Sequence, residues 1–140
     1  MLTVNTVVRP SLIEGLGLFA CEKIPAGHII WEFNPTFDTA YTAEEFDPLP
    51  AAAKTHVRKY SYFCAETNLW ILCGDDARFM NHADDPNTFE EPGNRTIALR
   101  DIAVGEEITC DYRQFDARSF VDEDFVPAEL QAVLHPLEAV

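Results

Sequence analysis

The sequence predicts a single domain with a mostly β core and short helices. Short runs of β-branched and aromatic residues recur along the chain, and 6 Gly and 9 Pro residues interrupt them. Only one region carries clear helix signals. A chain of 140 residues can bury one hydrophobic core, and 47% hydrophobic residues favour folding over disorder.

The first part of the chain predicts three strands. The β-branched run at residues 4–8 forms the first, residues 18–20 the second and residues 28–33 the third, which we expect to be buried because it contains Ile-Ile-Trp. Gly15 and Gly17 come just before the second strand, where the chain turns tightly or approaches a ligand.

Residues 34–59 hold the helical signals. Thr42 and Glu45 have the spacing of a capping box, which predicts a helix start, and Pro48 and Pro50 end that helix. A second short helix is predicted over residues 51–60.

The second part of the chain returns to strands. Residues 62–64 and 69–72 predict a hairpin around the polar residues 66–68. Two further strands are predicted at residues 96–99 and 107–109. Residues 113–140 alternate acidic residues with Phe115, Phe120 and Phe125, and a terminal helix is predicted from Pro127.

The net charge of −14 and the pI of about 4.4 disfavour direct binding to nucleic acid, which needs clustered Lys and Arg. An acidic surface attracts a basic peptide and speeds its encounter. The same charge also has a plainer explanation, because it keeps a protein soluble.

The four Cys residues stand singly, without a C-x-x-C or a pair of His, so we expect small buried thiols and no zinc site. The N-terminus lacks the pattern of a signal peptide, and no stretch approaches 18 apolar residues. We therefore expect no membrane association and a cytoplasmic protein, or a nuclear one in a eukaryote.

Three motifs stand in order between residues 14 and 112. The first is Glu14-Gly-Leu-Gly-Leu-Phe-Ala20, the second Arg78-Phe-Met-Asn-His82 followed by Pro86-Asn87, and the third Gly105-Glu-Glu-Ile-Thr-Cys-Asp-Tyr112. Together they resemble the signature of the SET domain, the fold of most protein-lysine methyltransferases. The resemblance implies a β-clip fold in which the segment around Asn81 threads beneath the Asp-Tyr strand as a pseudoknot, with residues 1–112 as the core.

The resemblance implies a site for S-adenosylmethionine. A Gly-x-Gly turn alone most often only makes a turn, but here it matches the cofactor-binding turn of the family. Asn81 matches the side chain that holds the methionine end, and the backbone of His82 matches the contact to adenine. The implied cofactor-binding residues are Glu14, Gly15, Leu16, Gly17, Tyr62, Arg78, Asn81, His82, Tyr112 and Phe115.

Tyr112 and Tyr62 match the catalytic tyrosines of the family. The attacking lysine must be neutral although its reference pKa is about 10.4, and an apolar channel lowers the cost of deprotonation. A Tyr112 hydroxyl at the channel floor would orient the amine. For Tyr62 a core aromatic at a strand end is the alternative reading.

Two departures from the family shape the remaining predictions. Asp84 stands where zinc-bearing members place a Cys, and no Cys cluster follows Tyr112, so no metal is expected. Residues 113–140 would then form the lid over the lysine channel. Cys110, Tyr62 and Phe120 are predicted to line that channel. Cys110 would leave room for several methyl groups, unless another side chain such as Phe89 fills the space.

The motifs thus predict a lysine methyltransferase that acts on a basic protein segment of a histone-like, ribosomal or nucleoid protein. A SET module that binds such a segment without turnover is the alternative, and an unrelated acidic interaction domain is a third reading. A homodimer is compatible with so small a domain, although the sequence shows no interface.

Overall fold

The computed structural model describes residues 1–117. Short strands dominate this part of the chain, with two α-helices and two 3₁₀ turns between them. In chain order the elements are β1 (Thr6–Pro10), β2 (Leu16–Ala20), β3 (Ile29–Glu32), β4 (Thr39–Tyr41), α1 (Ala43–Phe46), α2 (Ala51–Tyr60), β5 (Ser61–Cys64), β6 (Leu69–Leu72), η1 (Asp76–Phe79), β7 (Asn81–His82), β8 (Thr88–Glu91), β9 (Arg95–Ala98), β10 (Glu107–Cys110) and η2 (Tyr112–Gln114).

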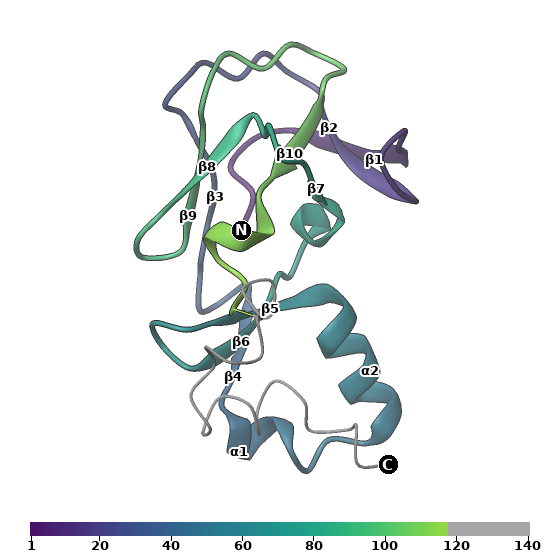
Figure 1. Ribbon diagram of the computed structural model, residues 1–140, viewed down its shortest axis with the longest axis vertical. Helices are drawn as coiled ribbons and strands as arrows, with labels where there is room; N and C mark the ends of the chain where they lie inside the picture. Colours follow the sequence, from purple (N-terminus) through teal and green to yellow (C-terminus); the bar gives the residue numbers. More distant parts are fainter. Residues whose placement is uncertain (118–140) are drawn as a thin grey trace.

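The strands form three small sheets with the orders β1-β2-β10-β7, β3-β9-β8 and β4-β6-β5. Figure 1 shows the first two sheets together in the upper half of the molecule, and the third sheet with α1 and α2 in the lower half. The predicted mostly β fold with short helices is confirmed.

The first strand lies two residues later than predicted. It runs over Thr6–Pro10 because it pairs antiparallel with β2, from Thr6 opposite Ala20 to Pro10 opposite Leu16. The bounds of β1 therefore follow those of its partner β2. The β-branched run that begins at Val4 does not set them. β1 is at the edge of its sheet, where Pro10 needs no ladder hydrogen bond.

Both predicted helices are present. The Thr42 hydroxyl accepts a hydrogen bond from the Glu45 amide and the Glu45 carboxylate accepts one from the Thr42 amide, each at 3.1 Å, which confirms the capping box of α1. The hairpin of β5 and β6 is also confirmed. Strands β4, β7 and β8 were not predicted, because each is short and takes its strand form from its neighbours.

Strands β7 and β10 pair in parallel, with Asn81 opposite Thr109 and Cys110 opposite His82. This pairing confirms the prediction that the second and third motifs are neighbours in space. The side chain of Asn87 strengthens the connection. Its amide oxygen accepts from the Thr109 backbone at 2.9 Å and its amide nitrogen donates to the Glu107 carbonyl at 2.8 Å. Asn87 is buried and so extends the hydrogen bonding of β10 with its side chain.

The core consists of three adjoining clusters. The upper one surrounds Leu18, Ile30 and Ile108, the middle one contains Trp31 and Tyr62, and the lower one contains Phe46, Val57, Phe63 and Trp70. Trp70 is fully buried in the lower cluster.

The prediction of buried thiols holds for three of the four Cys residues. Cys64, Cys73 and Cys110 are buried, and Cys21 is exposed. It follows directly on β2, at the point where the chain leaves the sheet. Burial raises the pKa of the Cys73 thiol to about 12, and burial likewise raises the pKa of Cys110 well above its ordinary value.

Phe120, Phe125 and the predicted terminal helix lie outside the described residues. Within residues 1–117, the longest helix is ten residues and none has the length and apolar character needed to span a bilayer.

We predict that Asn87→Ala lowers the free energy of unfolding by about 2–3 kcal/mol, because the part-buried carbonyl of Glu107 and the buried amide of Thr109 lose their partners. Denaturant unfolding measures this change. Asn5→Ala is the matched control, since the exposed Asn5 side-chain amide donates to the Glu22 carboxylate in an exposed hydrogen bond, and it should change stability by less than about 0.5 kcal/mol. Equal effects from the two variants would contradict this role of Asn87.

Candidate functional site

The turn before β2 lies against Asn81. Gly15 has a φ of +46°, a conformation that favours glycine, and its carbonyl accepts a hydrogen bond from the Ser11 amide. The Asn81 side chain donates to the backbone carbonyls of Glu14 and Leu16, at 3.1 Å each. The first and second motifs are therefore joined by hydrogen bonds.

Gly17 leaves room for the Glu107 side chain, which a Cβ at this position would force to move. A Cβ at this position would collide with the Glu107 carboxylate of β10, which lies 3.4 Å from the Asn81 amide nitrogen. The glycine thus lets the side chain of the third motif lie across the first.

His82 connects its own motif to the residue that follows β10. Its Nδ1 accepts a hydrogen bond from the Tyr112 backbone amide at 3.0 Å, and its Nε2 lies 3.0 Å from the Asp84 carboxylate. Because Nδ1 is an acceptor, Nε2 carries the hydrogen that bonds Asp84. These contacts fix both the imidazole ring and the backbone of Tyr112.

The Tyr112 hydroxyl is fixed by a second contact to the same segment. It donates to the Met80 carbonyl at 2.8 Å. Burial raises the pKa of Tyr112 to about 12, so the hydroxyl keeps its proton near neutral pH. With its hydrogen engaged by Met80, the oxygen presents its lone pairs to other groups as an acceptor.

Tyr112 forms part of the wall of a cavity of about 90 Å³. Five of the predicted site residues line this cavity: Tyr62, Arg78, Cys110, Tyr112 and Phe115. The Phe115 ring meets both tyrosine rings edge to face, with centroids 5.1 Å from Tyr62 and 5.9 Å from Tyr112. The cavity therefore has an aromatic wall, suited to an alkyl chain that ends in a cation.

The predicted residues thus fall into two neighbouring groups. Glu14, Leu16 and Asn81 lie together at the turn, and the five cavity residues lie around Tyr112. His82 and Met80 connect the two groups through their hydrogen bonds to Tyr112. Phe120 lies outside the described residues. The catalytic and binding roles of all these residues remain predictions.

Tyr62 is both a core residue and a cavity residue. It is 8% exposed, its hydroxyl donates to the Asn94 side chain at 2.9 Å, and burial raises its pKa. The two interpretations of Tyr62, a channel tyrosine and a core aromatic, are therefore compatible. Trp31, expected only in the core, also lines the cavity.

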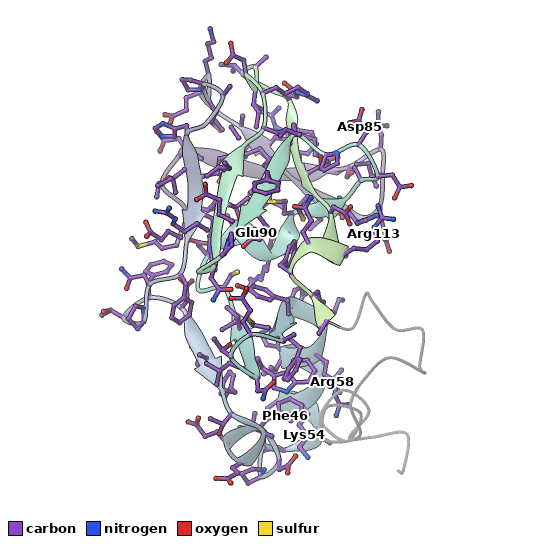
Figure 2. All side chains as sticks on the ribbon, turned by 60° about the vertical axis from the view of Figure 1, so that its left-hand side comes forward. Phe46, Lys54, Arg58, Asp85, Glu90 and Arg113 are labelled. Carbon is purple, nitrogen blue, oxygen red and sulfur yellow. The ribbon has the colours of Figure 1, made fainter. Side chains whose placement is uncertain are left out.

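Phe89 does not fill the space beside Cys110. Its side chain is 41% exposed and lies outside the cavity lining, whereas the next residue, Glu90, belongs to that lining. Figure 2 shows Glu90 at mid-height, where the upper strands meet the lower ones. Sequence reasoning missed this residue. The signal that could have found it is the alternation of faces along a strand. Residues two apart share a face, and Thr88 is buried, so Glu90 points to the same side.

In residues 1–117 no three side chains of His, Cys, Asp or Glu gather as a metal site would require.

Comparisons with known proteins agree with this geometry. The family model of the SET domain matches residues 15–113. Histone-lysine N-methyltransferase set1 of Dictyostelium discoideum is 34% identical over 115 residues, which cover 72% of this chain and 7% of the relative. Human histone-lysine N-methyltransferase 2B is 28% identical over 113 residues, 76% of this chain and 4% of the relative. The chain thus spans less than a tenth of the length of these relatives.

Solved structures show the same fold. A humanized mutant of the Chaetomium thermophilum Polycomb Repressive Complex 2, bound to an inhibitor, matches with a TM-score of 0.60 and 25% identity, over 80% of this chain and 15% of that one. An autoinhibited ctPRC2 bound to S-adenosylmethionine matches with a TM-score of 0.58 and 24% identity, over 80% and 16%. The match of the family model over most of the chain, together with three motifs brought into contact by the pairing of β10 with β2 and with β7, establishes that this chain belongs to the SET-domain family.

Proposed function

We propose that the chain transfers methyl groups from S-adenosylmethionine to the ε-amine of a lysine in a protein substrate. The observation that carries this proposal is the position of the Tyr112 hydroxyl, held by Met80 at the wall of an aromatic cavity. Membership of the SET family and the methyltransferase names of the relatives support it.

The residues of the turn fit the amino-acid end of the cofactor. The carbonyls of Glu14 and Leu16 each have a second lone pair, which suits an ammonium group, and the Asn81 amide is a polar group beside them. Gly15 has open space where a side chain would begin, so the backbone can approach a ligand closely. The cofactor supplies the methyl group on a positively charged sulfur.

The cavity fits the lysine side chain. Its walls from Tyr62, Phe115 and Tyr112 would enclose the alkyl chain and exclude water. An apolar surrounding disfavours the ammonium form and lowers the pKa of the amine. The Tyr112 oxygen, whose hydrogen is engaged by Met80, would accept a hydrogen bond from the amine and orient its lone pair.

The substrate is proposed to be a basic, lysine-containing protein segment. A net charge of −14 favours the encounter with such a segment. Histone-like, ribosomal and nucleoid proteins all present segments of this kind. The relatives are named for activity on histones, which makes a histone-like segment the first to test.

Transfer of labelled methyl from S-adenosylmethionine to a panel of basic proteins, read by mass spectrometry, tests the proposal. Methyl-lysine in one of the proteins supports it. If the chain binds the cofactor or a basic protein but leaves every lysine unmodified, the alternative of a binding module without turnover replaces it.

We predict that Tyr112→Phe reduces methyl transfer by about 100-fold, the loss typical of one positioned polar group in a buried site. Cofactor affinity should stay within a few-fold, because the aromatic ring remains. Tyr41→Phe, in β4 and away from the cavity, is the matched control and should keep its rate. Near-normal turnover of Tyr112→Phe would remove this tyrosine from the reaction.

Asn81→Ala is predicted to weaken cofactor binding by about 1–3 kcal/mol, because the carbonyls of Glu14 and Leu16 lose the amide that positions them. His82→Ala should have a smaller effect, since the predicted contact is through its backbone. Isothermal titration calorimetry measures both, with Asn5→Ala as the control. Unchanged affinity in Asn81→Ala would exclude Asn81 from the binding site.

A further inference from the structure

Glu90 occupies an unusual position between two cavities. On one side it lines the cavity that contains Tyr112, and on the other side it lines a second cavity of about 180 Å³. Phe115 is the one other residue that both linings share among the described part of the chain. The Glu90 side chain thus stands at the boundary between the proposed lysine site and a second opening.

The contacts of Glu90 hold it in place without neutralising it. The Thr96 hydroxyl donates to its carboxylate at 2.6 Å, and its backbone amide donates to the Gln114 side chain at 3.0 Å. None of the ion pairs found within residues 1–117 involves Glu90. Burial raises the pKa of this carboxyl to about 7, and the hydrogen bond from Thr96 opposes that rise.

Other titratable and charged groups face the same space. Those in the first cavity are Tyr60, Tyr62, Cys73, Arg78, Cys110, Tyr112 and Asp116. Those in the second cavity include Glu66 and Glu91. Arg78 is the cation of the first set, and its guanidinium lies over the Tyr60 and Phe79 rings at 5.1 Å from each centroid. Glu90 is therefore the carboxylate on β8 that an incoming ammonium would meet next to Tyr112.

We propose that Glu90 is the base that takes the proton from the substrate ammonium, and that the proton leaves through the second cavity. The inference rests on the proposed function. One N–H bond of the ammonium breaks, its electron pair stays on nitrogen, and the proton binds a Glu90 carboxylate oxygen. The freed pair forms the N–C bond to the methyl group of the sulfonium donor, while the C–S pair goes to sulfur. Glu90 then releases its proton to water.

The properties of the site suit this task better than those of a solvent-exposed carboxylate. A lysine ammonium has a pKa of about 10.4 in water. The pKa of Glu90, near 7, differs less from that value than the pKa of an ordinary Glu does, so proton transfer to Glu90 is less unfavourable. The aromatic walls of the cavity lower the pKa of the amine, and the negative charge of Glu90 opposes this effect until the proton has moved. A carboxylate with an ordinary pKa would instead hold the ammonium as an ion pair and slow its attack.

The first test compares Glu90→Gln with the wild type over pH 6–10 in the methyl-transfer assay. We expect kcat to fall by about 100-fold at pH 7, and the loss to shrink at high pH, where the lysine loses its proton to solvent. Glu90→Asp should recover part of the rate and the wild-type pH profile. Glu32→Gln, an exposed Glu on β3 of the same sheet, is the matched control and should keep the wild-type rate.

The second test uses the cofactor-free protein and does not depend on activity. Because the folded pKa of Glu90 is raised, its contribution to stability is complete below about pH 4.5 and is lost as the pH rises through about 7. Glu90→Gln should therefore melt near the wild-type temperature at pH 4.5 and above it at pH 8. A ¹³C carboxyl titration, with the Glu90 resonance assigned by its absence in Glu90→Gln, should show a midpoint near 7.

The outcomes separate the two proposals. A wild-type chain without methyl transfer would remove the proposed function, whereas an active wild type with an equally active Glu90→Gln would overturn the role of Glu90 alone. A rate loss in Glu90→Gln that is constant with pH would indicate a structural role and would also overturn it, as would a carboxyl midpoint near 4.5. If Glu90→Gln does not fold, the profile of Glu90→Asp and the ¹³C titration of the wild type decide, with the Glu90 resonance then assigned by its absence in Glu90→Asp.

Discussion

The site depends on the parallel pairing of two very short strands. β7 contributes two residues and β10 four, yet their pairing holds Asn81 beside the Gly turn and Tyr112 beside the cavity. Two residues of β-ladder are marginal alone. The buried Asn87 side chain supplies the missing hydrogen bonds to β10, and His82 continues the connection to the backbone of Tyr112. The side chains of Asn87 and His82 thus add hydrogen bonds to the short backbone ladder between β7 and β10.

This arrangement explains why the site residues are so far apart in the sequence. The turn at Gly15 packs on β10 through β2, and the cavity takes its aromatic wall from β5 and from the segment after β10. Strand β10 connects both parts, since it pairs with β2 and contributes Cys110 to the cavity. Displacing it by one residue would exchange the inward and outward side chains and move Tyr112 away from the cavity.

The sequence allowed the fold class, both helices, the β5–β6 hairpin and the proximity of the three motifs to be predicted. These features depend on local signals, such as the capping box at Thr42, or on motifs with fixed chemistry. The inward position of Glu90 could not be read in the same way. A Phe–Glu pair suggests that Phe89 points inward, but pairing with Thr96 directs Glu90 to the interior and leaves Phe89 exposed. The register of β8 against β9 determines which of the two side chains points inward, and local hydrophobicity does not.

The distribution of the cysteines has a practical consequence. Thiolates react with maleimides and disulfides, whereas protonated thiols scarcely do. Cys73 and Cys110 are buried with raised pKa values and Cys64 is buried, so Cys21 is the accessible thiol. Cys21 follows β2, whose other end begins at the Gly turn. A fluorophore attached at this native residue would report on the sheet that carries the turn, without substitution of any other cysteine.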